Sequence, residues 1–226
     1  MASARTLRWL AAARRQPSAW LLLFQICGVL IYPAMEGMAA GQVAFGAFGM
    51  MVLVLALWVV DRSASSNAVA WALAIPAVLL SAGALISQRP EPLVHAHVLE
   101  ALLYFYTASA LIAYMLHDHK VTRDELYAVG ATFTLLAWGF AYAYLVCQAW
   151  FPGSFSAPEA PGQPRSWTEL LFLSFSVLSG VGLSDVIPVR PPARALVTLE
   201  AFAGVMYIAV VVSRLVGLTV PRLPPR

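Results

Sequence analysis

The chain has 226 residues, of which 61% are hydrophobic and only 11% are charged, and its formal net charge is +3. About a quarter of the residues of a soluble globular domain are charged. This chain therefore has too few charges to cover a water-exposed surface, and we expect most of it to lie in lipid. Its two cysteines, Cys27 and Cys147, fall in apolar runs, which favours buried packing over a disulfide framework.

Six apolar runs are each long enough to cross a bilayer. In chain order they are Ser18–Met35, Val43–Val60, Ala68–Ile86, His97–Leu116, Leu126–Phe151 and Ala193–Leu218. A backbone exposed to lipid must satisfy its own hydrogen bonds, and no alternating barrel pattern occurs in these runs. The sequence therefore predicts an all-α integral membrane protein with six transmembrane helices.

The placement of Lys and Arg predicts the orientation of these helices. If residues 1–17, a basic N-terminal segment, lie in the cytoplasm, the inner segments hold Arg5, Arg8, Arg14, Arg15, Arg62, Lys120, Arg123, Arg214, Arg222 and Arg226. The outer segments then hold Arg89, Arg165, Arg190 and Arg194. This inward excess predicts that both termini are cytoplasmic.

A short apolar stretch follows the polar segment 151–165. Ser166 and Glu169 have the spacing of a capping box, in which the two side chains satisfy free N–H groups at a helix start. A helix over Trp167–Leu178 is about 18 Å long at about 1.5 Å per residue. It cannot cross a hydrocarbon core of about 30 Å, so we expect it to dip into the membrane and return.

The segment after this short helix reads Ser-Gly-Val-Gly-Leu-Ser-Asp over residues 179–185, and Pro188 follows. A non-helical chain is tolerated at membrane depth only where protein buries it or water lines it. A water-filled pore is one setting that meets this condition.

These residues resemble the tetrameric potassium-channel superfamily, in particular its small prokaryotic six-helix members. That family typically reads T-T-V-G-Y-G-D followed by x-x-P, after a short pore helix with an aromatic-Ser-Phe stretch. Residues 173–175 read Leu-Ser-Phe, residues 179–185 fall on the seven filter positions, and Pro188 falls on the proline. The inner helix of the family has a recurrent pattern that this chain matches at Arg194, Leu199, Glu200, Gly204, Tyr207 and residues 214–217.

The resemblance implies that four identical chains surround one axis and aim backbone carbonyls at a dehydrated cation. It assigns the ion-conducting filter to Ser179, Gly180, Val181, Gly182, Leu183 and Ser184. The carbonyl groups of Gly180, Val181, Gly182 and Leu183 are the expected ligands of K⁺, which is the permeant ion and not a resident cofactor. Asp185, Ser176 and Glu200 are expected to support the filter, with Ser176 as the candidate partner of Asp185.

Three filter residues depart from the family pattern. Gly180 stands where the family has a Thr hydroxyl, and Leu183 stands where a Tyr usually braces the filter. Ser184 replaces a Gly that is usually left-handed, which costs a non-glycine residue about 1–2 kcal/mol. We expect these changes to reduce or alter selectivity for K⁺, and a filter that collapses and conducts nothing is a further hypothesis.

The resemblance places a gating hinge at Gly204, although close helix packing is an equally good interpretation of a glycine there. A cavity-facing stripe is expected at Val205, Ile208, Val212 and Val216, and a lipid or packing face is the alternative. The run His97–Leu116 occupies the place of a voltage-sensing helix but contains no Lys or Arg. We therefore expect no steep voltage gating through it.

The predicted domains are residues 1–17, a four-helix peripheral domain lacking gating charges over 18–124, and a pore domain over 125–226. The predicted function is passive conduction of K⁺ or other monovalent cations by a homotetramer. The resemblance to prokaryotic members implies a location in a bacterial inner membrane. Its partners are other copies of the chain and membrane lipid, with no nucleic acid, and no enzymatic site is expected. The alternatives are a non-conducting structural or regulatory protein on a channel scaffold and a secondary transporter.

Overall fold

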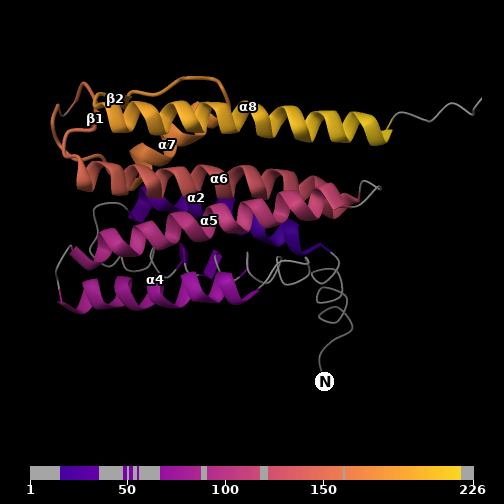
Figure 1. The fold of residues 1–226 in the computed structure, drawn as a ribbon, viewed down its shortest axis with the longest axis horizontal. Helices are drawn as coiled ribbons and strands as arrows, with labels where there is room; N and C mark the ends of the chain where they lie inside the picture. Colours follow the sequence, from indigo (N-terminus) through magenta and orange to yellow (C-terminus); the bar gives the residue numbers. More distant parts are fainter. Residues whose placement is uncertain are drawn as a thin grey trace, which may run out of the picture.

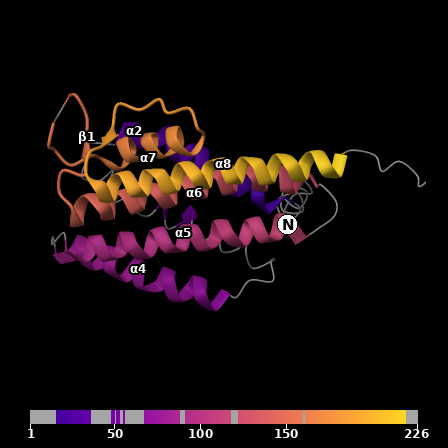
Figure 2. The same ribbon diagram turned by 45° about the horizontal axis from the view of Figure 1, so that its top comes forward.

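The computed structural model describes residues 16–35, 48–49, 51–52, 55, 67–87, 91–117, 122–159 and 161–219. Most of the expected basic segment 1–17 and of the expected span Val43–Val60 lies outside these residues. The long helices run side by side along one direction, with α8 on one side of α6 and with α5 and α4 on the other (Figure 1). The short helix α7 lies beside α6 and α8 at one end of the molecule in both ribbon views (Figures 1 and 2).

The described residues form six helices and one pair of two-residue strands. The helices are α2 (Pro17–Met35), α4 (Asn67–Ser87), α5 (Glu91–His117), α6 (Arg123–Trp150), α7 (Trp167–Leu178) and α8 (Pro191–Thr219). The strands β1 (Phe155–Ser156) and β2 (Ile187–Pro188) pair antiparallel, with Phe155 opposite Pro188 and Ser156 opposite Ile187. The predicted α-helical class therefore agrees with the fold, to which the strands add only this short antiparallel pair.

Several described helices begin earlier than the hydrophobic pattern predicts, among them α5 and α8. α5 starts at Glu91 instead of His97, and α8 starts at Pro191 instead of Ala193. Proline is well tolerated in a first helical turn, because the N–H that it lacks has no partner within the helix there. Hydrophobicity marks the part of each helix that meets apolar surroundings, whereas these prolines mark where the helix begins.

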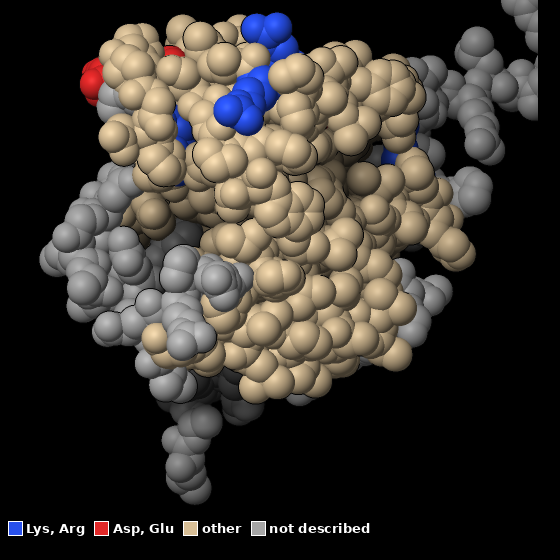
Figure 3. Space-filling model, turned by 60° about the vertical axis from the view of Figure 1, so that its left-hand side comes forward, with Lys and Arg blue, Asp and Glu red and all other residues tan. Residues whose placement is uncertain are grey.

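Three of the described helical segments are long and apolar enough to cross a membrane: Pro92–His117, Arg123–Trp150 and Pro191–Val216. Pro17–Tyr32 and Ala68–Ala84 are apolar but shorter. They coincide with two further predicted spans, so the count of six spans stays a prediction. The end of the molecule that carries β1 and β2 is mainly uncharged on its visible face, with basic side chains at its upper edge (Figure 3).

The core is centred on α6. About two thirds of the apolar stretch of α6 is buried within the chain, whereas only 17% of the apolar stretch of α8 is buried. On α6, Trp138 packs edge-on against Trp167 of α7 with ring centroids 5.3 Å apart, and it also contacts Tyr104 of α5 at 5.7 Å. Helix α6 thus connects the peripheral helices to α7, while most of α8 is left open to surroundings outside the single chain.

Candidate functional site

The start of α7 is fixed by the capping box that the sequence predicts. Ser166 Oγ accepts a hydrogen bond from the Glu169 N–H at 3.3 Å, and Glu169 Oε2 accepts one from the Ser166 N–H at 2.6 Å. These two bonds satisfy backbone donors that have no partner within the helix. The helix accordingly begins at Trp167 and ends at Leu178, as predicted.

The chain just before α7 is held against α6. The Gln148 side chain accepts a hydrogen bond from the Arg165 N–H at 2.9 Å and donates one to the Arg165 carbonyl at 2.8 Å. The guanidinium of Arg165 lies 3.2 Å from the carboxylate of Glu169. Side chains from α6 and α7 therefore fix the point at which the chain turns back.

The middle of α7 is tied to both neighbouring helices through a buried carboxylate. Glu200 of α8 is fully buried, and its two oxygens accept hydrogen bonds from Tyr144 of α6 and Ser174 of α7. Ser174 Oγ also lies 2.8 Å from the carbonyl oxygen of Ala137 on α6. A buried carboxyl group needs such partners, and these hydrogen bonds join α8 to both α6 and α7.

Gly180, the second residue after α7, is a left-handed glycine that closes the end of the helix. Gly180 has a φ of +74°, and its N–H donates to the Val177 carbonyl at 3.0 Å. The N–H of Gly182, with a φ of +70°, donates to the Ser176 carbonyl at 3.0 Å. A left-handed glycine that satisfies carbonyls of the last turn is a common helix C-cap. Gly180 is therefore part of the end of α7 as well as of the expected filter.

The expected filter residues lie at the surface of the single chain. Val181 and Leu183 are 70% and 71% exposed, although both are apolar. Val186, a few residues later, is buried, and its N–H donates to Ser184 Oγ at 3.1 Å. The segment is thus anchored at both ends and open between them.

The expected hydrogen bond between Ser176 and Asp185 is not formed. Ser176 Oγ is buried and has no hydrogen-bond partner among the described residues, and Asp185 is exposed. The carbonyl of Ser176, in contrast, accepts from Gly182. Within one chain the backbone of Ser176, and not its side chain, supports the expected filter.

Gly204 of α8 touches the last turn of α7. A Cβ atom placed on Gly204 would lie 2.1 Å from the carbonyl oxygen of Leu178 and 2.8 Å from its carbonyl carbon. Real Cβ atoms do not come so close to a backbone, so only glycine fits here without displacing α7. The structure thus supplies a packing reason for this glycine, and the hinge stays a prediction.

The expected cavity stripe lies on the open side of α8. Val205, Ile208, Val212 and Val216 are 62%, 40%, 52% and 55% exposed. These apolar side chains have no extensive cover from the described residues of the single chain. Their exposure is compatible with a surface completed by lipid or by other copies of the chain.

Sequence reasoning missed two features of this site. Tyr144 is one of many aromatic residues in α6, and nothing in the sequence distinguishes it as a partner of Glu200. The contact of Leu178 with Gly204 is made by backbone, which carries no sequence signal. The sequence marks Ser174 only as part of the Leu-Ser-Phe stretch, since its hydrogen bonds depend on the position of α7 between α6 and α8.

Comparison with known proteins identifies relatives of this region. A family model described as "Ion channel" matches residues 101–220, a range that includes α6, α7 and α8. The chain is 38% identical over 74 residues to "Inward rectifier potassium channel Kirbac3.1" of Paramagnetospirillum magnetotacticum, and this stretch covers 33% of the chain. It spans only 22% of the length of that relative. No solved structure gives a significant match.

Proposed function

The chain belongs to the potassium-channel superfamily, and we propose on this basis that it forms a homotetrameric pore for passive conduction of K⁺ and related monovalent cations. The observation that carries the proposal is the arrangement of α7 between two long apolar helices. Helix α7 is too short to cross a bilayer, and an exposed glycine-containing segment follows it. Such a re-entrant segment is tolerated at membrane depth where it lines a water-filled path.

A single chain presents only one side of such a path, so the pore requires further copies. The exposed Val181 and Leu183 and the open side of α8 supply apolar surface that other copies would cover. Four chains around one axis would bring the carbonyl groups of Gly180, Val181, Gly182 and Leu183 together as ligands for a dehydrated cation. The membrane-spanning helices then hold this ring in lipid.

We further propose that the pore discriminates weakly between K⁺ and Na⁺. The positions of Gly180, Leu183 and Ser184 lack the threonine hydroxyl, the tyrosine brace and the second glycine of the usual filter. Within the chain, the Ser176 side chain does not reach Asp185, so this bond does not brace the outer end either. A loosely held ring adapts to ions of different size, which reduces the preference for one of them.

Ion flux into liposomes that contain the purified protein tests this function. We expect K⁺ and Rb⁺ to pass, Na⁺ to pass at a comparable rate, and the large cation NMDG⁺ to be excluded. The variant Leu183→Tyr with Ser184→Gly is the matched control, because it restores two residues of the usual filter and should lower Na⁺ flux relative to K⁺ flux. Strong K⁺ selectivity in the original protein, equal to that of this variant, would contradict the proposed weak discrimination.

A non-conducting scaffold is the second candidate. The Ser176 hydroxyl, which has no partner among the described residues, and the exposed Asp185 favour it, since an unbraced filter can close. A protein that assembles as a tetramer in detergent but shows no flux of any cation would support this candidate. A monomer with saturable, coupled uptake would instead indicate a transporter.

A further inference from the structure

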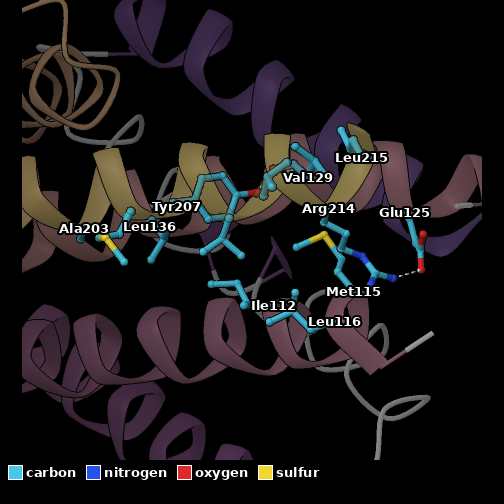
Figure 4. Close-up of a pocket in the computed structure, with 13 residues that line it drawn as sticks. Ile112, Met115, Leu116, Glu125, Val129, Leu136, Ala203, Tyr207, Arg214 and Leu215 are labelled. Carbon is cyan, nitrogen blue, oxygen red and sulfur yellow. Dashed lines mark hydrogen bonds and ion pairs between the residues drawn. The ribbon is translucent and has the colours of Figure 1, made fainter. Parts of the chain in front are cut away.

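A cavity of about 290 Å³ lies between α5, α6 and α8, away from the filter segment. Its wall is formed mainly by apolar side chains, among them Ile112 and Met115 of α5, Val129 and Leu136 of α6, and Met206 and Val210 of α8. Figure 4 shows Ile112 and Met115 of α5 and Arg214 of α8 in the space between these two helices. The cavity exists because α5 and α8 both pack on α6 but make little direct contact with each other.

The polar groups that border the cavity already have partners. Tyr207 donates its hydroxyl hydrogen to the Val129 carbonyl at 2.6 Å. At the end of the cavity near the start of α6, Arg214 Nη2 lies 3.4 Å from Glu125 Oε1 (Figure 4). Glu125 Oε2 also accepts from the Thr122 N–H at 3.2 Å. A polar occupant would therefore find few free partners, whereas water needs two to four of them.

We propose that this cavity binds the acyl chain of a membrane lipid. The three helices that line the cavity contain the three long apolar segments of the described chain. In a membrane, the acyl chains of lipids are therefore the most abundant apolar molecules near the cavity. Filling an apolar cavity with hydrocarbon recovers contacts that an empty space lacks. The bound acyl chain would bridge the space between α5 and the C-terminal half of α8, two segments that make little direct contact with each other.

Photo-crosslinking tests the site independently of ion conduction. The probe is phosphatidylcholine with a diazirine in its acyl chain, present as a trace in phosphatidylcholine vesicles that hold the protein. Its neutral headgroup removes any general attraction to Arg214. We expect the label on peptides that contain Met115, Met206 or Tyr207.

Two α8 variants sharpen the result. Val210→Phe places a larger side chain in the cavity and should reduce labelling of these peptides several-fold. Ala209→Phe adds bulk one residue away, at an exposed position that does not line the cavity, and should leave the labelling unchanged. Equal labelling of the original protein and both variants would overturn the proposal. So would absence of label from the cavity, the result expected if another copy of the chain fills it.

Thermal unfolding in detergent supplies a second measurement if Val210→Phe folds poorly. A ligand that binds only the folded state raises its stability. Adding phosphatidylcholine to delipidated protein should raise the unfolding temperature of the original protein and of Ala209→Phe. Met206→Trp, which fills the same cavity from a half-exposed position, should show a smaller rise. An equal rise in all three proteins would overturn the proposal.

Discussion

Gly180 shows how one residue can serve two purposes. In the sequence, it stands at the inner end of the expected filter, where the family has a threonine with a hydroxyl group. In the structure, its φ of +74° and its hydrogen bond to the Val177 carbonyl make it the residue that ends α7. A threonine at this position would need the left-handed conformation that β-branched residues avoid. The departure from the family pattern therefore has a conformational reason.

Replacing Gly180 with alanine or threonine should destabilise the protein. A non-glycine residue in the left-handed region costs about 1–2 kcal/mol, and β-branched threonine should cost more than alanine. Urea unfolding in detergent measures this loss, and flux into liposomes should also fall because the end of α7 shifts.

Gly162→Ala is the control for this prediction. Gly162 has a φ of +79° and open space around it, in the loop before α7. It should lose comparable stability but retain flux. Unchanged stability of Gly180→Thr would show that the end of α7 does not need this conformation.

At the scale of the helices, the decisive contact is between α7 and α8. Gly204 lets α8 approach the last turn of α7, and Glu200, one turn earlier, binds Ser174 in the middle of α7. Both contacts hold the short helix from the same side. The position of α7, and with it the start of the expected filter, therefore depends on α8.

Gly204→Ala should force α7 and α8 apart. Insertion of a methyl group into a closely packed contact typically costs about 1–3 kcal/mol, and the shift would displace Leu178, immediately before the expected filter. Thermal unfolding should show the loss, together with reduced flux.

Gly83→Ala is the matched control, because Gly83 lies in α4 and a Cβ atom added to it would meet nothing within 4 Å. It should be neutral or slightly stabilising, since alanine favours helix formation more than glycine does. If Gly204→Ala altered gating at full stability, the hinge interpretation would be favoured over packing.

At the scale of the whole molecule, the described helices α2, α4 and α5, which the sequence predicts to be peripheral, contain no Lys or Arg that could serve as voltage-sensing charges. Helix α5 contains no Lys or Arg from Glu91 to His117. Each elementary charge that crosses the membrane field contributes about 2.3 kcal/mol per 100 mV, so a helix without such charges supplies little energy from the field.

We therefore expect currents in planar bilayers to change only gradually with voltage. The steepness of the conductance–voltage relation measures this. Substitution of Leu102 and Leu116, two exposed residues of α5, by Arg should steepen the relation if α5 moves. An e-fold change of conductance over a few millivolts in the original protein would contradict the prediction.

Much of this architecture could be predicted because it is recorded in local patterns. The capping box of Ser166 and Glu169 indicated the start of α7, and apolar runs indicated the approximate bounds of the other described helices. Contacts that depend on how helices meet could not be predicted in the same way. The partner of Gly204 is a backbone carbonyl, and the expected pairing of Ser176 with Asp185 rested on resemblance alone.

The antiparallel pairing of β1 with β2 has a consequence for how the chain folds. Pairing Phe155 with Pro188 closes a loop that contains all of α7 and residues 179–185, the expected filter. Closing a loop of roughly 30 residues costs about 3 kcal/mol of chain entropy, and a few strand hydrogen bonds offset only part of it. The loop is therefore expected to close late, after α6 and α8 have met across Glu200. Residues 179–185 would then be among the last parts of the chain to acquire their final shape.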